Sequence, residues 1–87
     1  MKIIKRDGSF EGFSAGKIEK VVKAAGLPKE KARALARKIG FELKIMGKKE
    51  IHSSELRDMI ASELKKADRY AYDLYIWYEG TKDKKTS

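Results

Sequence analysis

The sequence has 87 residues, 39% of them charged, and a formal net charge of +8 at pH 7. This is the size of one small domain, and its basic balance favours anionic partners. The absence of cysteine excludes disulfides, thiol catalysis and cysteine-bound zinc. No apolar run approaches the roughly 18 residues of a membrane span and no secretory signal is present, so we expect a soluble, cytoplasmic protein. The absence of Asn and Gln beside abundant Lys and Glu is typical of a thermophile.

The first predicted element is a β-hairpin with strands over residues 2–6 and 9–13. Asp7-Gly8 between them is a typical pair for a type I′ turn, in which both central residues have positive φ. Because two strands alone are marginally stable in water, the hairpin must pack on helices. We expect Ile3, together with Phe10 or Phe13, to face the core.

Two helices are predicted next. Ser14 should cap the first through its hydroxyl, and Gly26 should end it. The second spans residues 28–46 and should stop at Gly47, while Gly40 inside it costs roughly 1 kcal/mol relative to alanine. Apolar residues recur at helical spacing in both helices: Ile18, Val21, Val22 and Ala25 in the first, and Ala32, Leu35, Ala36, Ile39, Leu43 and Met46 in the second.

The second half of the chain predicts a loop and two more helices. Residues 48–52 read as a loop with a short extended piece, after which Ser53 should cap a third helix. Asp68 should cap a fourth helix over residues 69–79, which has an unusually aromatic surface. The predicted fold is therefore α+β and mostly helical, with an N-terminal β-hairpin packed on a four-helix bundle. We expect one domain over residues 1–79 and a disordered basic tail over residues 80–87.

Three cations surround the start of the first helix and predict an anion site. Lys5 and Arg6 precede the hairpin turn, and Lys17 lies in the first helical turn. A nucleotide also needs an apolar surface for its base, which Ile3 and Phe13 offer. Taken singly, each residue is more typical of a solvated surface or a plain turn; what favours a site is their joint spacing, which resembles that of the family described below.

The sequence gives little support for a catalytic site or a metal site. The stretch from Gly12 to Lys17 looks like a Walker phosphate loop, but it is one residue short. Ile18 also stands where Ser or Thr should hold Mg²⁺. His52 is the only histidine and has no nucleophile partner, and nothing pairs Asp58 and Asp73 as an acid and a base. We therefore expect no metal site and no enzyme activity.

These motifs have a family counterpart. Three segments carry it: the hairpin Lys5-Arg6-Asp7-Gly8 followed by Glu11, Phe13, Ser14 and Lys17-Ile18, then residues 51–58, and then the aromatic last helix. Together they resemble the ATP-cone, a nucleotide-sensing module of ribonucleotide reductases and of a bacterial repressor of their genes. The resemblance covers residues 2 to 79 and implies a hairpin followed by four helices. It implies nucleotide contacts from Ile3, Lys5, Arg6, Glu11, Ser14, Lys17, Ser53 and Arg57. The departures are Ser14, where the family often carries Asp or Asn, Gly16, where a longer residue is usual, and the lack of a clear match for a basic residue of the last helix.

The resemblance implies a non-catalytic regulatory module that binds ATP or dATP with Mg²⁺. It would act through nucleotide-dependent homo-oligomerisation, or in trans on a ribonucleotide reductase or transcription factor. The alternative is a small basic nucleic-acid-binding protein whose binding falls with salt, or an adaptor in which the nucleotide site has decayed. The nucleic-acid surface would lie on the second helix, with Lys29, Lys31, Arg33, Arg37, Lys38 and Lys44.

Overall fold

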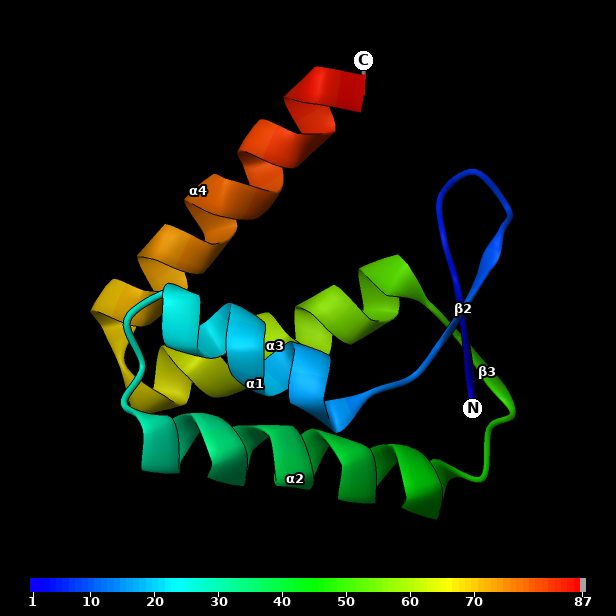
Figure 1. Cartoon of the computed structure of the whole chain (residues 1–87), viewed down its shortest axis with the longest axis horizontal. Coiled ribbons are helices and arrows are strands. Elements are labelled where there is room, and N and C mark those ends of the chain that lie inside the picture. Colours follow the sequence, from blue (N-terminus) through cyan, green and yellow to red (C-terminus); the bar gives the residue numbers. More distant parts are fainter. Residues whose placement is uncertain (87) are drawn as a thin grey trace.

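The computed structural model describes the backbone of residues 1–86 and the side chains of residues 1–79 (Figure 1). The fold is α+β and mostly helical, which confirms the predicted class and the hairpin followed by four helices. Along the chain the elements are β1 (Lys2–Ile4), β2 (Phe10–Gly12), α1 (Ala15–Ala24), α2 (Lys29–Met46), β3 (Glu50–His52), α3 (Ser53–Ala67) and α4 (Arg69–Thr86).

The extended piece expected within residues 48–52 is a third strand. The sheet order is β2-β1-β3, with β1 antiparallel to β2 and parallel to β3. Ile3 pairs with Ile51 in the register, and both side chains are buried. Because β1 is the middle strand, the start of α3 is held directly beside the hairpin.

The hairpin turn differs from the predicted type I′ turn. Gly8 has a φ of 87°, and no described residue other than glycine has a positive φ. The Gly8 N–H donates to the Lys5 carbonyl at 3.0 Å, and the Lys5 N–H donates to the Ser9 carbonyl at 2.8 Å. This is a three-residue connection in which a type I turn is closed by a glycine bulge. Asp7 keeps negative φ while its carboxylate accepts from the Ser9 N–H and hydroxyl, and these bonds lower the pKa of Asp7.

The helix caps follow the sequence only in part. Asp68 caps α4, because its Oδ1 accepts from the backbone N–H groups of Tyr70 at 2.9 Å and Ala71 at 3.3 Å. Ser14 occupies the N-cap position of α1, but its hydroxyl makes no capping bond. Ser53 is the first residue of α3 rather than its cap, since His52 at the end of β3 takes that position.

The helix ends are mostly as predicted. Gly47 stops α2 with a φ of 67°. The α4 backbone, however, runs to Thr86 instead of ending at residue 79. Gly80 disfavours a helix by only about 1 kcal/mol and no proline follows it, so nothing in the sequence forces a stop. The side chains of residues 80–87 lie outside the described part of the chain, and the division into a domain and a disordered tail stays a prediction.

The core lies between the sheet and helices α1 to α3, with Ala71 and Tyr75 of α4 packed into it, and its largest fully buried side chains are Ile39, Ile51, Leu64 and Val22. Phe13 packs against this core, whereas Phe10 is 57% exposed, which settles the open choice between them. The first half of α4 packs on α3, and its second half projects away from the bundle (Figure 1). None of the described helices combines the length and apolarity needed to cross a membrane.

Gly40 gives a stability prediction. A Cβ added there would lie 3.8 Å from the Phe13 ring, an ordinary van der Waals contact. Gly40→Ala should therefore raise the free energy of unfolding by about 0.5–1 kcal/mol, because alanine is the better helix former. Urea denaturation measures the change. The control Gly47→Ala should lower it by about 1 kcal/mol, since Gly47 has a positive φ. Destabilisation by Gly40→Ala would mean that the Phe13 ring lies closer to Gly40 than the structure has it.

Candidate functional site

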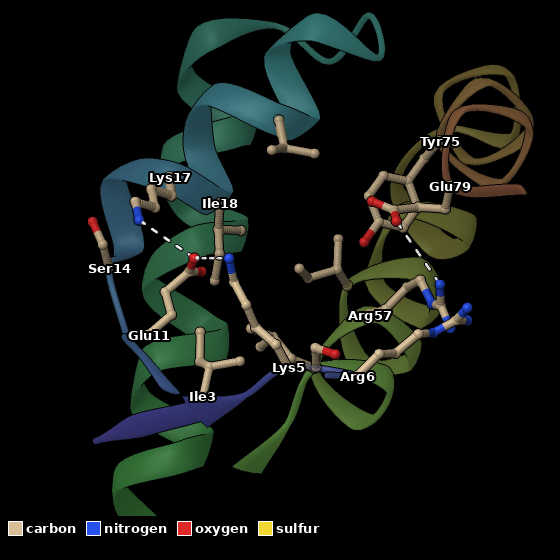
Figure 2. Close-up of a pocket in the computed structure, with 14 residues that line it drawn as sticks. Ile3, Lys5, Arg6, Glu11, Ser14, Lys17, Ile18, Arg57, Tyr75 and Glu79 are labelled. Atoms are coloured by element: carbon tan, nitrogen blue, oxygen red, sulfur yellow. Dashed lines mark ion pairs between the residues drawn. The ribbon is translucent and has the colours of Figure 1, made fainter. Parts of the chain in front are cut away.

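A pocket of about 450 Å³ opens between the hairpin, α1, α3 and α4 (Figure 2). This volume is within the range of small-molecule sites in proteins. The eight residues for which the family resemblance implied nucleotide contacts all line it: Ile3, Lys5, Arg6, Glu11, Ser14, Lys17, Ser53 and Arg57. The sequence reasoning missed the others, which are Ile18, Val21, Leu56, Ile60, Tyr75 and Glu79.

The sheet register assembles this pocket. Ile3 pairs with Glu11 across the hairpin, so their side chains share a face of the sheet. Lys5 follows Ile3 by two residues and belongs to the same face. On the other side of β1, Ile4 pairs with His52, which brings Ser53 next to Lys5 and Arg6 although the sequence separates them widely.

One end of the pocket holds two lysines around a carboxylate. The Glu11 Oε2 lies 3.3 Å from the Lys5 Nζ and 3.9 Å from the Lys17 Nζ (Figure 2). The lysine side chains are 50% and 65% exposed. Exposed ion pairs of this kind contribute at most about 1 kcal/mol. Both ammonium groups can therefore turn from Glu11 to a stronger anion at little cost.

The opposite end holds two arginines and a second carboxylate. Arg6 and Arg57 line this part of the pocket, and Figure 2 shows the ion pair between Arg57 and Glu79. The Arg57 Nη1 lies 3.9 Å from the Glu79 Oε2, and the two side chains are 25% and 19% exposed. With Lys5, Lys17, Arg6 and Arg57 against Glu11 and Glu79, the described lining carries a net charge of +2. The pocket thus favours an anionic ligand.

Apolar side chains close the pocket between these two ends. Ile18 and Val21 come from α1, Leu56 and Ile60 from α3. Tyr75 adds a buried ring from α4, and burial raises the pKa of its hydroxyl well above the ordinary value, with the nearby Glu79 adding to the effect. Tyr75 is therefore a neutral hydrogen-bond donor at physiological pH. This wall is suited to the flat face of a base or to an aliphatic group.

The expectation that Phe13 borders a base is wrong. Phe13 does not line the pocket, because its ring points into the core and lies near Gly40 of α2. The apolar surface comes instead from α1, α3 and α4. The sequence signal for Tyr75 and Glu79 is limited to their spacing, since Ala71, Tyr75 and Glu79 recur every four residues along one helix face. The more conspicuous aromatics at 70, 77 and 78 lie on the exposed side.

A second pocket of about 420 Å³ lies between α1 and the middle of α4. Its lining is mostly apolar: Lys20, Val21, Ala24, Ala25, Leu74, Tyr75, Trp77 and Tyr78. Val21 and Tyr75 line both pockets. Trp77 is 68% exposed and Tyr78 is 50% exposed. Clustered exposed aromatics of this kind are common in protein–protein interfaces. We call this second pocket the aromatic groove.

The basic face of α2, the candidate nucleic-acid surface, is partly neutralised. The Lys38 Nζ lies 2.9 Å from Glu63 of α3, and a hydrogen bond to Glu63 raises the pKa of Lys38. Arg33 pairs with Glu19 of α1 at 3.4 Å. Among the described residues, no group of three or more His, Cys, Asp or Glu side chains is placed to hold a metal ion.

The hairpin, the four helices and the pocket at the start of α1 define a small α+β domain with a pocket that favours an anionic ligand. The family model described as the ATP cone domain matches residues 1–84, and the chain belongs to this family. It is 33% identical over 76 residues to the transcriptional repressor NrdR of Chlamydia trachomatis serovar L2 and to that of Chlamydia muridarum. It is 30% identical to NrdR of Chlamydia felis. Each match covers 83% of this chain, which spans about half the length of these relatives.

Proposed function

We propose that this chain is a non-catalytic regulatory module that binds ATP or dATP, with Mg²⁺, in the pocket between the hairpin, α1, α3 and α4. The observation that carries the proposal is the meeting of four cationic side chains and an apolar wall in one pocket of a chain that belongs to the ATP cone domain family. Phosphates require charge-assisted donors, and a base requires an apolar surface.

The lining of the pocket suggests which part of the nucleotide each group of residues contacts. Lys5, Lys17 and the two arginines bind the phosphates, and the buried wall of α1, α3 and α4 receives the base. Ser14 and Ser53 supply hydroxyls for phosphate or ribose oxygens. Glu11 is the nearest acceptor to the lysines and also serves as a partner for a ribose hydroxyl.

The output is nucleotide-dependent association in the cytoplasm, either between copies of the chain or in trans with a ribonucleotide reductase or a transcription factor. The aromatic groove supports this proposal, because it adjoins the nucleotide pocket through Val21 and Tyr75. The relatives named as transcriptional repressors favour a partner in gene regulation. A ligand regulates such association only if it binds one packed state better than the other.

Isothermal titration calorimetry with ATP, dATP and GTP in the presence of Mg²⁺ tests the proposal. We expect micromolar dissociation constants for the adenine nucleotides, about −8 kcal/mol, and weaker binding of GTP. Sedimentation velocity with and without ATP then measures association. If no nucleotide binds at millimolar concentration, the proposal is wrong. A DNA titration at two salt concentrations would then test the basic face of α2, for which affinity must fall steeply with salt.

A further inference from the structure

Glu79 is an unusual residue for a phosphate-binding pocket. It is an acid on α4, one turn beyond Tyr75, and it pairs with Arg57 of α3 at 3.9 Å. Its side chain is only 19% exposed. The rest of the lining suits an anionic ligand, but this carboxylate pairs with Arg57, a cation that a phosphate would otherwise bind.

The Arg57–Glu79 pair also holds two helices together. Ala71 and Tyr75 are buried against the bundle, and beyond Glu79 the helix projects away from it (Figure 1). The other carboxylate of the pocket differs in this respect. Glu11 pairs with Lys5 in its own hairpin and with Lys17 just after it, so a change of partner there separates no two helices. Only at Glu79, among the described lining residues, does exchange of an anion change a contact between helices.

We propose that Glu79 competes with the phosphates of the bound nucleotide for Arg57, so that occupation of the pocket releases the Glu79 turn of α4 from α3. The inference rests on the proposed function. A phosphate group carries more charge than a carboxylate and can accept two parallel bonds from the guanidinium. Glu79 meets Arg57 only at 3.9 Å, so a phosphate displaces it. The carboxylate that remains nearby is repelled by the phosphates, which adds to the release.

The release reaches the aromatic groove directly. Trp77 and Tyr78 immediately precede Glu79, and Tyr75 is a wall shared by the two pockets. Movement of this turn therefore changes the shape of the groove when the nucleotide pocket fills. By linkage, a partner that prefers the released groove strengthens nucleotide binding by the same factor.

Glu79→Gln tests the competition. The variant keeps the size of the side chain and removes its charge, so we expect it to bind ATP about two- to fivefold more tightly than the original protein in calorimetry. Asp73→Asn is the matched control. It removes one negative charge from the same helix, where Asp73 pairs with Arg69 at 3.4 Å and lies outside the pocket. Its ATP affinity should equal that of the original protein.

Hydrogen–deuterium exchange tests the release. In the original protein, ATP should speed exchange of the amides of residues 76–79, because a helical turn without tertiary contacts is marginally stable. In Glu79→Gln these amides should exchange rapidly even without ATP. ATP-induced protection of residues 76–79, or equal ATP affinity of Glu79→Gln and the original protein, would overturn the inference and leave the proposed function standing. If ATP binds to neither protein, both proposals fail together.

Discussion

Replacing Lys5 and Lys17 together with alanine should weaken ATP binding by about 100-fold. Both ammonium groups lie near one carboxylate at the end of the pocket, 3.3 and 3.9 Å from Glu11. Hydrogen bonds to charged groups contribute about 1.5–3 kcal/mol each. Because both lysines are half-exposed or more, the lower value applies, and about 3 kcal/mol for the pair corresponds to roughly 100-fold in the dissociation constant. Calorimetry with ATP and Mg²⁺ measures it.

The matched control is Lys29→Ala/Lys31→Ala. It removes the same charge from exposed positions on α2 that do not line the pocket. ATP affinity should stay within about twofold of the original value, because exposed charges beyond a Debye length are screened. Equal losses in the two double variants would mean that net charge alone attracts the nucleotide, and the pocket would lose its assigned role. Circular dichroism of both variants checks that the fold is retained.

Ile39→Ala should lower the free energy of unfolding by about 3 kcal/mol. Ile39 is fully buried in the middle of α2, and truncation of such a residue removes transfer free energy and leaves a cavity. For a domain of this size the melting temperature should fall by roughly 12–24 °C. Thermal and urea denaturation both measure the change.

Ile45→Ala is the control on the same helix. Ile45 is 69% exposed, so truncation leaves no cavity, and alanine is the better helix former. Its free energy of unfolding should stay within about 0.5 kcal/mol of the original. If both variants lose the same stability, the register of α2 on the bundle is not the one described.

The helices were predictable because each carries a local signal. The apolar residues of α1 and α2 recur at helical spacing, and the buried side chains Val22 and Ile39 lie on those stripes. Strand β3 was harder to predict. It has only three residues, and its identity depends on pairing with β1, which is distant in the sequence. The hairpin turn differs from the predicted type I′ turn because the Asp7 carboxylate accepts a hydrogen bond from Ser9. This bond stabilises a geometry that the dipeptide Asp7-Gly8 does not specify alone.

The pocket was predictable at its hairpin and helix termini, where motif residues cluster. The wall that α4 contributes to the pocket was not predictable from the sequence. The helical period places Tyr75 and Glu79 on one face of α4, but the sequence does not say that this face closes a pocket lined by Lys5 and Arg57. That depends on how α4 packs on α3. Phe13 was misplaced for the same reason, since its apolar ring suits either a base or the core.

The parallel ladder between β1 and β3 also governs when the pocket can form. It closes the loop from Ile4 to His52, and such distant closure is slow and entropically costly. A growing chain completes the hairpin early but has no Arg57 opposite it until α3 has emerged and docked. Nucleotide in the proposed site would therefore contact only the completed fold. At a hundred times its dissociation constant it would add about 2.7 kcal/mol of stability, and it would do so by slowing unfolding rather than by speeding folding.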